Sequence, residues 1–222
     1  MSTPELRAAS LLVEHLRAMP RTTVPLRAER KRISREIAGW DRDTVLRFAR
    51  ALIDARLPRF IAYELVLNHR PTMDSITIAE VEALGKGMAS WGDVDCFGCF
   101  IAGPAWREGR IPDRLVKLWA RSGDWCWRRA ALVATVPLRD SKRALAICRV
   151  LIDDRHDLVV KALSWALRAM SKYDPSSARE FIAEHRGRLA ARVLREVGNK
   201  LTTGLKNGRP GGSRYQTPGS KR

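Results

Sequence analysis

The sequence contains no apolar run that approaches the roughly 20 residues needed to cross a bilayer as a helix. Its first residues, MSTPELRAAS, have no apolar stretch behind a basic segment and so do not resemble a secretory signal peptide. From these two absences we expect a soluble, cytoplasmic protein. The four cysteines are then expected to stay reduced.

Signatures of cofactor and metal chemistry are also missing. The chain has neither a GxGxxG nor a GxxxxGK[ST] loop, no HExxH motif, and four histidines without metal-ligand spacing. Cys96 and Cys99 form a CxxC pair, but no second pair and no suitably placed histidine accompany them. We interpret the pair as small buried residues. We therefore expect neither a cofactor nor a metal.

Acidic residues are scarce relative to basic ones. The chain has 24 Asp and Glu against 41 Lys and Arg, which gives a formal net charge of +17. Such a charge favours polyanionic partners, either nucleic acid or an anionic membrane surface. A general drift of the genome towards arginine is the alternative explanation. Hydrophobic residues make up 45% of the chain, which is enough for a packed core.

Strand patterns are almost absent, and helical patterns follow one another along the chain. Ser2-Thr3-Pro4-Glu5 predicts the start of a first helix. The apolar stripe of this helix is predicted to contain Leu6, Leu11, Leu12 and Leu16. Further helices are predicted over residues 41–56, 58–69, 75–88, 92–102, 112–121, 124–136, 140–152, 157–172 and 177–204. Breaks are predicted at Pro71, Gly103-Pro104, 122–124, Pro137, 153–154 and 174–175.

The helices are short and recur at about two per 40 residues, which is the rhythm of HEAT-like solenoids. We predict an all-α fold, an α-solenoid of HEAT-like antiparallel helix pairs, as one domain over residues 1–205. A plain helical bundle is the alternative, because the units show little similarity to one another. Residues 206–222 are rich in Gly, Pro and basic residues and are predicted to form a disordered basic tail.

Three segments combine tryptophan with charge. In the helix predicted over 157–172, one face is apolar, with Val159, Leu163, Ala166 and Met170. Another face carries Lys161, Trp165, Arg168 and Lys172 at helical spacing. A tryptophan inside a basic stripe suits a surface that meets a phosphate backbone together with a sugar or base. The alternative is that Trp165 is a core residue flanked by cations that reach to solvent.

The other two segments lie earlier in the chain. Arg128 and Arg129 are adjacent in a predicted helix and project about 100° apart, so one can face solvent while the other enters a groove. Asp95 follows Trp91 by four residues, which places both on one helix face. A carboxylate there is either a helix cap or a site residue, and Asp93 suits the cap better because it lies closer to the helix start.

These three segments, in this order, resemble the AlkD-like DNA alkylation repair family of HEAT-repeat glycosylases. The matching stretches are Ser90–Asp95, Trp127–Leu132, Lys161–Arg168 and Ser171-Lys172, and the resemblance extends over about residues 25–204. It implies an α-solenoid whose concave basic face holds duplex DNA. The sequence itself gives little sign of oligomerisation, so we expect a monomer, and we expect no membrane partner. Gly92 departs from the pattern, since the family often has an acid or another residue there.

Four site residues follow from the resemblance. The family's catalytic aspartate falls on Asp95, its two tryptophans fall on Trp91 and Trp165, and its arginine falls on Arg129. Trp125 and Trp127 receive no role. The residues expected to bind DNA are Arg32, Arg35, Arg128, Lys161, Arg168 and Lys172.

The residue types suit the chemistry that the resemblance implies. A purine alkylated at N3 or N7 is cationic and leaves without a general acid, so one carboxylate near C1′ is enough to stabilise an oxocarbenium-like sugar or to hold water. Two alternatives remain open. One is a non-catalytic HEAT-like protein that binds damaged or branched DNA. The other is a helical scaffold for an acidic protein partner.

Deleting residues 206–222 removes five basic residues and no acid. We expect a shallower salt dependence of DNA binding, because fewer counterions are released, and unchanged base release. Fluorescence anisotropy over a salt series measures the slope. An unchanged slope would remove the tail from the DNA interface.

Overall fold

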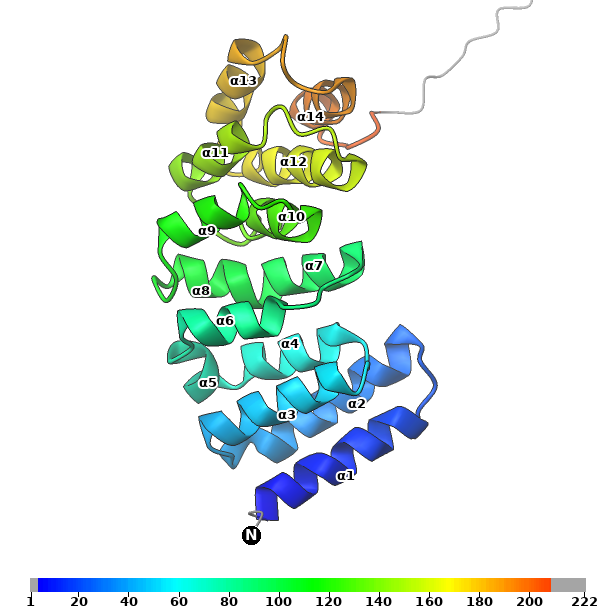
Figure 1. Ribbon diagram of the computed structural model, residues 1–222. Coiled ribbons are helices and arrows are strands. Elements are labelled where there is room, and N and C mark those ends of the chain that lie inside the picture. The colour runs from blue at the N-terminus through cyan, green and yellow to red at the C-terminus, as the bar shows by residue number, and fades with distance from the viewer. Residues whose placement is uncertain (1–3, 209–222) are drawn as a thin grey trace, which may run out of the picture.

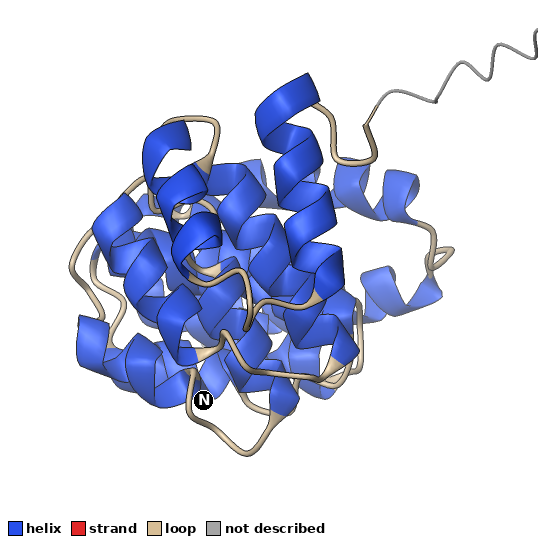
Figure 2. Cartoon of the chain, turned by 90° about the horizontal axis from the view of Figure 1, so that it is seen from above, coloured by secondary structure: helices blue, strands red, loops and turns tan. Residues whose placement is uncertain are grey.

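The computed structural model describes residues 4–208, and this part of the chain is helical with no strand (Figure 2). The helices are α1 (Pro4–Ala18), α2 (Thr23–Glu36), α3 (Arg42–Asp54), α4 (Arg59–Asn68), α5 (Arg70–Asp74), α6 (Ile78–Gly85), α7 (Trp91–Phe97), α8 (Gly103–Arg107), α9 (Asp113–Trp119), α10 (Trp125–Val133), α11 (Ser141–Val150), α12 (Asp157–Met170), α13 (Pro175–Glu184) and α14 (Ala191–Thr203). A 3₁₀ turn (Ile37–Gly39) follows α2, and a π-helical segment (Gly98–Ala102) joins α7 to α8.

The helices stack as a solenoid along one long axis (Figure 1). One continuous row consists of α2, α4, α7, α10, α12 and α14, each packed against the next, and we call it the stacked row. Several other helices pair with this row, as α3 does with α4, α9 with α10 and α11 with α12, and α1 packs on α3. The contacts therefore join helices that lie close together along the chain, as in a solenoid. The all-α, solenoid-like fold expected from the sequence is confirmed.

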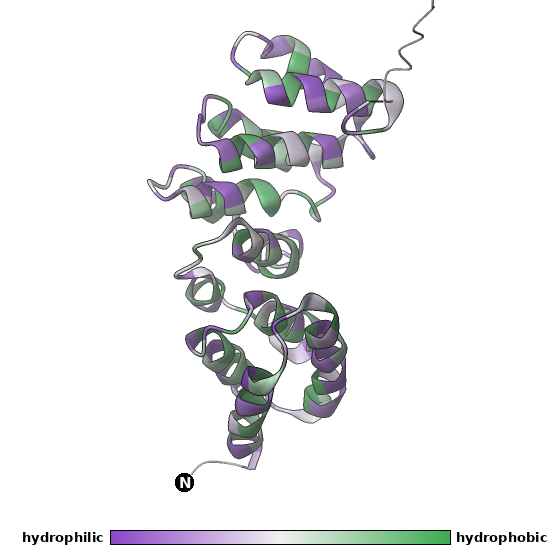
Figure 3. Ribbon diagram, turned by 90° about the vertical axis from the view of Figure 1, so that its right-hand side faces the viewer, coloured by the Kyte–Doolittle hydropathy of each residue, from purple (hydrophilic) through white to green (hydrophobic). Residues whose placement is uncertain are grey.

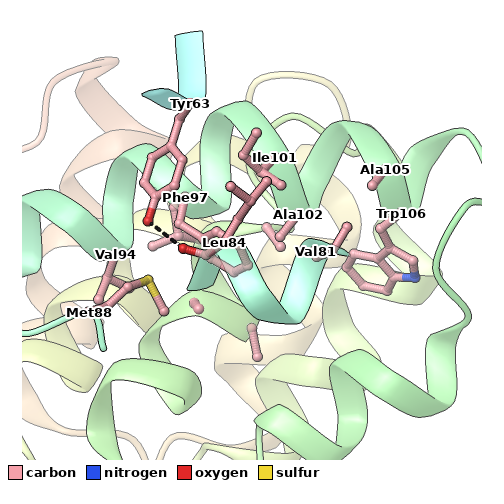
Figure 4. Close-up of a cluster of buried hydrophobic side chains, with 14 of the residues drawn as sticks. Tyr63, Val81, Leu84, Met88, Val94, Phe97, Ile101, Ala102, Ala105 and Trp106 are labelled. Atoms are coloured by element: carbon pink, nitrogen blue, oxygen red, sulfur yellow. Dashed lines mark hydrogen bonds between the residues drawn. The ribbon is translucent and has the colours of Figure 1, made fainter. Parts of the chain in front are cut away.

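Apolar and polar residues are mixed along the helices (Figure 3), and the buried apolar residues lie between the stacked row and the helices that pack on it. Around α4, α6 and α7 the fully buried side chains include Tyr63, Phe97 and Trp106 (Figure 4). The Tyr63 hydroxyl donates a hydrogen bond of 3.0 Å to the Leu84 carbonyl, which satisfies a polar atom inside this apolar cluster. This contact fixes the end of α6, and thus the turn that leads into α7.

Several sequence predictions of helix boundaries are wrong. No helix was predicted over residues 23–36, but they form α2. Only Leu26 and Ile33 of this arginine-rich helix are buried, so its apolar pattern is too sparse to recognise. The helix predicted over 177–204 is two helices, because the chain turns between Glu184 and Ala191. The helix break predicted at Pro71 occurs two residues earlier, at His69 between α4 and α5. Pro71 itself lies in the first turn of α5, where its missing N–H costs no helical hydrogen bond.

Gly103-Pro104 was predicted as a break, but the helix continues through it from Trp91 to Arg107. Proline removes an N–H and crowds the carbonyl four residues earlier, and a π-helical turn relieves this. Here the Gly103 N–H donates to the Gly98 carbonyl, five residues back. The predicted break is therefore absent, and the helix widens locally instead.

The structure also differs from the sequence predictions for one apolar residue of α1 and for the start of α6. Leu11 was placed on the apolar stripe of α1 but is 72% exposed, because it lies about 100° from the buried Leu12. The helix predicted from residue 75 begins only at Ile78, after the N-cap Thr77, which forms a capping box with Glu80. The predicted capping residues Ser2 and Thr3, and the predicted tail from residue 209 onward, lie outside the described residues. No helix within residues 4–208 is long and apolar enough to cross a membrane.

The approach of α10 to the π-helical segment depends on glycine. A Cβ atom on Gly98 would lie 2.6 Å from Cγ1 and 2.7 Å from Cβ of Val133. We expect Gly98→Ala to lower the free energy of unfolding by about 1–3 kcal/mol, because this overpacking must push α10 away. Urea unfolding measures it, with Gly187→Ala as the matched control, since a Cβ there meets nothing within 4 Å. Equal stabilities for the two variants would contradict the close-packing account.

Candidate functional site

Helix α7 begins with a capping box that leaves Asp95 free of any capping role. The Ser90 hydroxyl accepts from the Asp93 backbone N–H at 3.1 Å, and the Asp93 carboxylate accepts from the Ser90 N–H at 3.3 Å. The expectation that Asp93 serves the helix start is confirmed. Asp95 lies half a turn later, where its carboxylate is not needed by the backbone.

Asp95 and Arg129 are joined across the contact between α7 and α10. Arg129 Nε donates to Asp95 Oδ1 at 2.8 Å, and Arg129 Nη2 donates to Asp95 Oδ2 at 2.9 Å. This is a bidentate pair, in which two parallel charge-assisted hydrogen bonds fix the planes of both groups. Arg129 is 5% exposed and the Asp95 side chain is 19% exposed. The carboxylate is therefore held rigidly while one side of it remains open to solvent.

A third helix holds the arginine in place. Arg129 Nη1 donates to the backbone carbonyl of Leu158, in the first turn of α12. The guanidinium thus links α7, α10 and α12, three successive helices of the stacked row. Its orientation towards Asp95 is set at both ends of the planar group.

The two tryptophans of the predicted site lie on two of the helices that Arg129 links, α7 and α12. Trp91 is the first residue of α7 and is 61% exposed, on the same face as Asp95. Trp165 is half-buried on α12, seven residues after Leu158, which corresponds to two turns or about 10 Å along the helix. Both rings are accessible and lie on the helices that contact Arg129.

The basic residues predicted on α12 have different surroundings. Lys161 pairs with Asp157 at 2.6 Å, and Lys172 is exposed with no side-chain partner in the described part of the chain. Arg168 donates to the Ser164 hydroxyl at 3.3 Å and lies 3.7 Å from Glu196. Burial holds the pKa of Arg168 below its usual value, and the nearby Glu196 carboxylate opposes this shift. Arg168 and Lys172 line a cavity beside Trp165 with a volume of about 240 Å³.

The remaining predicted DNA contacts are placed less simply. Arg128 donates to Asp154 at 2.6 Å and to the carbonyls of Ser122 and Gly123, so its guanidinium fastens α10 to two turns. Arg32 on α2 pairs with Glu29 at 2.8 Å and with Glu36 at 2.6 Å. Arg35, on the same helix, is exposed and has no recorded side-chain partner among residues 4–208.

The cysteine pair lies beside Asp95 but is poorly suited to thiolate chemistry. Burial raises the pKa of Cys96 to about 11 and that of Cys99 to about 12, with the Asp95 charge as the next cause. Both residues are half-buried rather than fully buried as expected. Within residues 4–208, no group of three or more His, Cys, Asp and Glu side chains is arranged to hold a metal ion.

Sequence reasoning missed several residues that shape the site. The Leu158 carbonyl is a backbone atom and leaves no mark in a residue pattern. Glu196 on α14 is buried and accepts from Ser164 at 2.7 Å, and its partner lies 32 residues away. Trp125 stacks on His156 at 5.1 Å, whereas Trp127 is partly buried and packs on the core residue Phe97.

Comparison with known proteins bears on this arrangement. A family model described as DNA alkylation repair enzyme matches residues 19–201, from the turn before α2 into α14. The matched range includes Trp91, Asp95, Arg129 and Trp165 and confirms the resemblance seen in the sequence. No curated protein and no solved structure matches the chain.

Breaking the ion pair at Arg129 has a predictable effect on stability. We expect Arg129→Ala to lower the free energy of unfolding by about 2–3 kcal/mol, because it unties three helices and leaves a mostly buried carboxylate unpaired. Arg35→Ala, at an exposed position on α2, is the control and is expected to change stability by less than about 0.5 kcal/mol. Urea unfolding of both variants checks this. A loss at Arg129 no larger than the control would show that the pair does not hold the helices together.

Proposed function

The chain belongs to the family of DNA alkylation repair enzymes, and we propose that it is a DNA glycosylase that hydrolyses the N-glycosidic bond of cationic N3- and N7-alkylated purines in duplex DNA. The observation that carries the proposal is the bidentate Asp95–Arg129 pair, with one side of the carboxylate open to solvent. A repair enzyme that removes such a base starts base excision repair. It acts as a monomer on cytoplasmic, nucleoid-associated DNA.

The chemistry needs little beyond a well-placed negative charge. An alkylated purine carries a positive charge, so when its bond to C1′ breaks the electron pair of that bond leaves it neutral. The sugar becomes oxocarbenium-like until a water oxygen bonds to C1′ and releases a proton. The Asp95 carboxylate stabilises this sugar cation and accepts a hydrogen bond from the attacking water. Because the leaving group is already cationic, no general acid is required.

Arg129 is a positioning residue in this proposal. A carboxylate near a solvent-exposed surface samples several rotamers, whereas the fork of a guanidinium permits one orientation. Preorganisation matters because an electrostatic group that must reorient during the reaction loses much of its effect. The Leu158 carbonyl supports the same function by fixing the far side of the guanidinium.

Trp91 on α7 and Trp165 on α12 are proposed to supply flat surfaces for the substrate. Aromatic faces pack against deoxyribose and attract a developing cation, with about 0.5–2 kcal/mol for each cation–π contact. The 61% exposure of Trp91 supports a role in binding, since a large exposed tryptophan is costly without a partner. Arg35 and Lys172, which have no side-chain partner among residues 4–208, are proposed to contact phosphates directly. Lys161 and Arg168 are proposed to do so as well, although each also lies near a carboxylate. Arg32 and Arg128 hold two acceptors or more within the protein and are proposed to add long-range attraction only.

A second candidate function is DNA binding without base release. It is favoured by the use of both Asp95 oxygens in the pair with Arg129, an arrangement that also suits a purely structural ion pair. Under this alternative the basic residues keep their function and Asp95 only joins α7 to α10.

Release of alkylated bases separates the two candidates. The purified protein is incubated with methylated duplex DNA, and free 3-methyladenine and 7-methylguanine are quantified. We expect release by the parent and a loss of about 10²–10³-fold in Asp95→Asn, because the amide keeps the shape but loses the charge. DNA affinity should be equal or higher, since a negative charge near the polyanion is removed.

Asp43→Asn is the matched control, because this carboxylate is exposed and lies on α3, outside the stacked row. It should release bases at the parent rate. Equal rates for Asp95→Asn and the parent would show that Asp95 is structural. DNA binding without base release by either protein would establish the second candidate.

A further inference from the structure

A second cationic site lies at one edge of the solenoid, away from the Asp95–Arg129 pair. The turns between α1 and α2, between α3 and α4, and between α6 and α7 all lie along the right-hand edge in Figure 1. Two adjoining cavities of about 720 and 520 Å³ open there, and they share Ile53, Arg56, Arg59 and Gly87. We call the combined feature the edge cleft. Its cationic lining consists of Arg21, Arg50, Arg56, Arg59 and Lys86.

These cations have few internal partners. The side chains of Arg50, Arg56 and Lys86 are exposed and make no hydrogen bond or ion pair within residues 4–208. Arg21 donates one long hydrogen bond, 3.5 Å, to the Arg56 carbonyl. Several other arginines among residues 4–208 are matched with acids, as Arg143 is with Asp113 and Arg188 is with Asp153. The edge cleft is therefore a concentration of positive charge that the fold does not neutralise.

Arg59 forms the floor of the edge cleft and is held only by neutral acceptors. Its Nη1 donates to the Tyr63 hydroxyl and to the Leu84 carbonyl, both at 3.1 Å, and its Nη2 donates to the Lys86 carbonyl at 3.0 Å. A guanidinium has five N–H groups, so Nε–H and one Nη2–H remain available. The group is thus fixed in orientation, fully charged, and has donors to spare for an oxyanion.

The backbone around Arg59 is shaped to leave this space open. Gly87 has φ of +73°, and a Cβ atom there would lie 3.3 Å from Arg59 Nη2. Arg56 has φ of +55°, a left-handed conformation that glycine or asparagine usually occupies after a helix. An arginine that tolerates this strain is a hint of function rather than of packing.

Two carboxylates also border the edge cleft, and neither cancels its charge. Asp93 is engaged in the capping box of α7, and Asp54 is exposed on the rim. Five cations against two carboxylates leave an excess of positive charge over a small area. The ligand that such a surface selects is a polyanion with repeated oxyanions.

We propose that the edge cleft binds the phosphodiester backbone of the DNA at a point outside the site of base release. Asp93 borders the cleft, and Asp95 faces Arg129 on α10. Residues two apart on a helix project about 200° apart, so the cleft and the carboxylate lie on opposite sides of α7. The width of one helix, about 10–12 Å, corresponds to roughly three base pairs of duplex at 3.4 Å each. The proposal rests on DNA as the substrate of the proposed function and extends the contact surface beyond the lesion.

The test measures how DNA binding depends on salt in a variant of the edge cleft. The variant combines Arg50→Gln, Arg56→Gln and Lys86→Gln, all at exposed positions, so folding is expected to be intact and is checked by urea unfolding. The control combines Arg110→Gln, Arg114→Gln and Lys117→Gln, which removes the same charge at exposed positions around α9. Anisotropy titrations use an unmodified 20-base-pair duplex over a series of salt concentrations.

Each lost phosphate contact makes the negative slope of log K against log salt shallower by about 0.9. We expect the magnitude of the slope to fall by about 2–3 for the cleft variant and by less than about 1 for the control. Equal slopes for the two variants would overturn the proposal. Thermal unfolding in pyrophosphate is measured in parallel. If the cleft variant kept the parent's slope but lost stabilisation by pyrophosphate, the cleft would bind a small phosphate compound and not DNA.

Base release distinguishes this proposal from the proposed function. The cleft variant should keep the parent's rate at saturating methylated duplex and show a raised KM, because its substitutions lie outside the reacting groups. If the cleft variant shows a shallower salt dependence but the protein releases no base, the edge cleft is supported and the glycosylase proposal is rejected. If the salt dependence is unchanged and bases are released normally, the glycosylase proposal is supported and the edge cleft is rejected.

Discussion

The bidentate contact between Asp95 and Arg129 serves both the packing of this solenoid and its proposed chemistry, because it holds successive helices together and fixes the proposed catalytic carboxylate. Solenoids are held together mainly by contacts between neighbouring repeats, so a polar tie between successive helices has a large effect on their relative position. Here one guanidinium reaches α7 through Asp95 and α12 through the Leu158 carbonyl. Removing either charge from a pair this buried leaves the other without a partner, which is more costly than never having had the pair.

The same pair would solve an electrostatic problem of the proposed reaction. A glycosylase of net charge +17 that holds a polyanion must still present one negative group close to the sugar. In this proposal Arg129 offsets the repulsion between Asp95 and nearby phosphates, while part of the carboxylate stays in contact with solvent. Asp93, two residues earlier, has the same side chain but is consumed by the capping box, so the helix start and the proposed chemistry use separate carboxylates. The proposed roles are also separated in space. The cations of the edge cleft would attract DNA on one side of α7, and Asp95 would present its negative charge on the other side.

Much of the fold followed from periodicity, and the failures have identifiable causes. The buried face of α12, with Val159, Leu163 and Met170, was readable because apolar residues recur at helical spacing. Helix α2 was not, since its arginines outnumber its two buried residues. Proline at 104 was interpreted as a break because a pattern does not show that a π-helical turn can absorb it. Local signals therefore predicted helices better than they predicted their ends.

The candidate site shows the same limit at longer range. The i, i+4 spacing placed Trp91 beside Asp95, and the family resemblance pointed to Arg129. The partner of Arg128, Asp154, lies 26 residues along the chain, so nothing local indicated that this guanidinium is engaged within the protein. The edge cleft was likewise invisible, because its cations come from three turns and from α3 and α4, which meet only after folding.

Asp95, held in place by Arg129, is proposed to stabilise positive charge on the sugar. The most direct measurement compares the affinity for duplex DNA that contains a positively charged pyrrolidine ring in place of one deoxyribose with the affinity for the neutral tetrahydrofuran analogue. A preference for the cationic analogue of at least about 100-fold in the parent, as transition-state analogues show, and its loss in Asp95→Asn is the predicted result. An equal preference in both proteins, or none in the parent, would contradict the account.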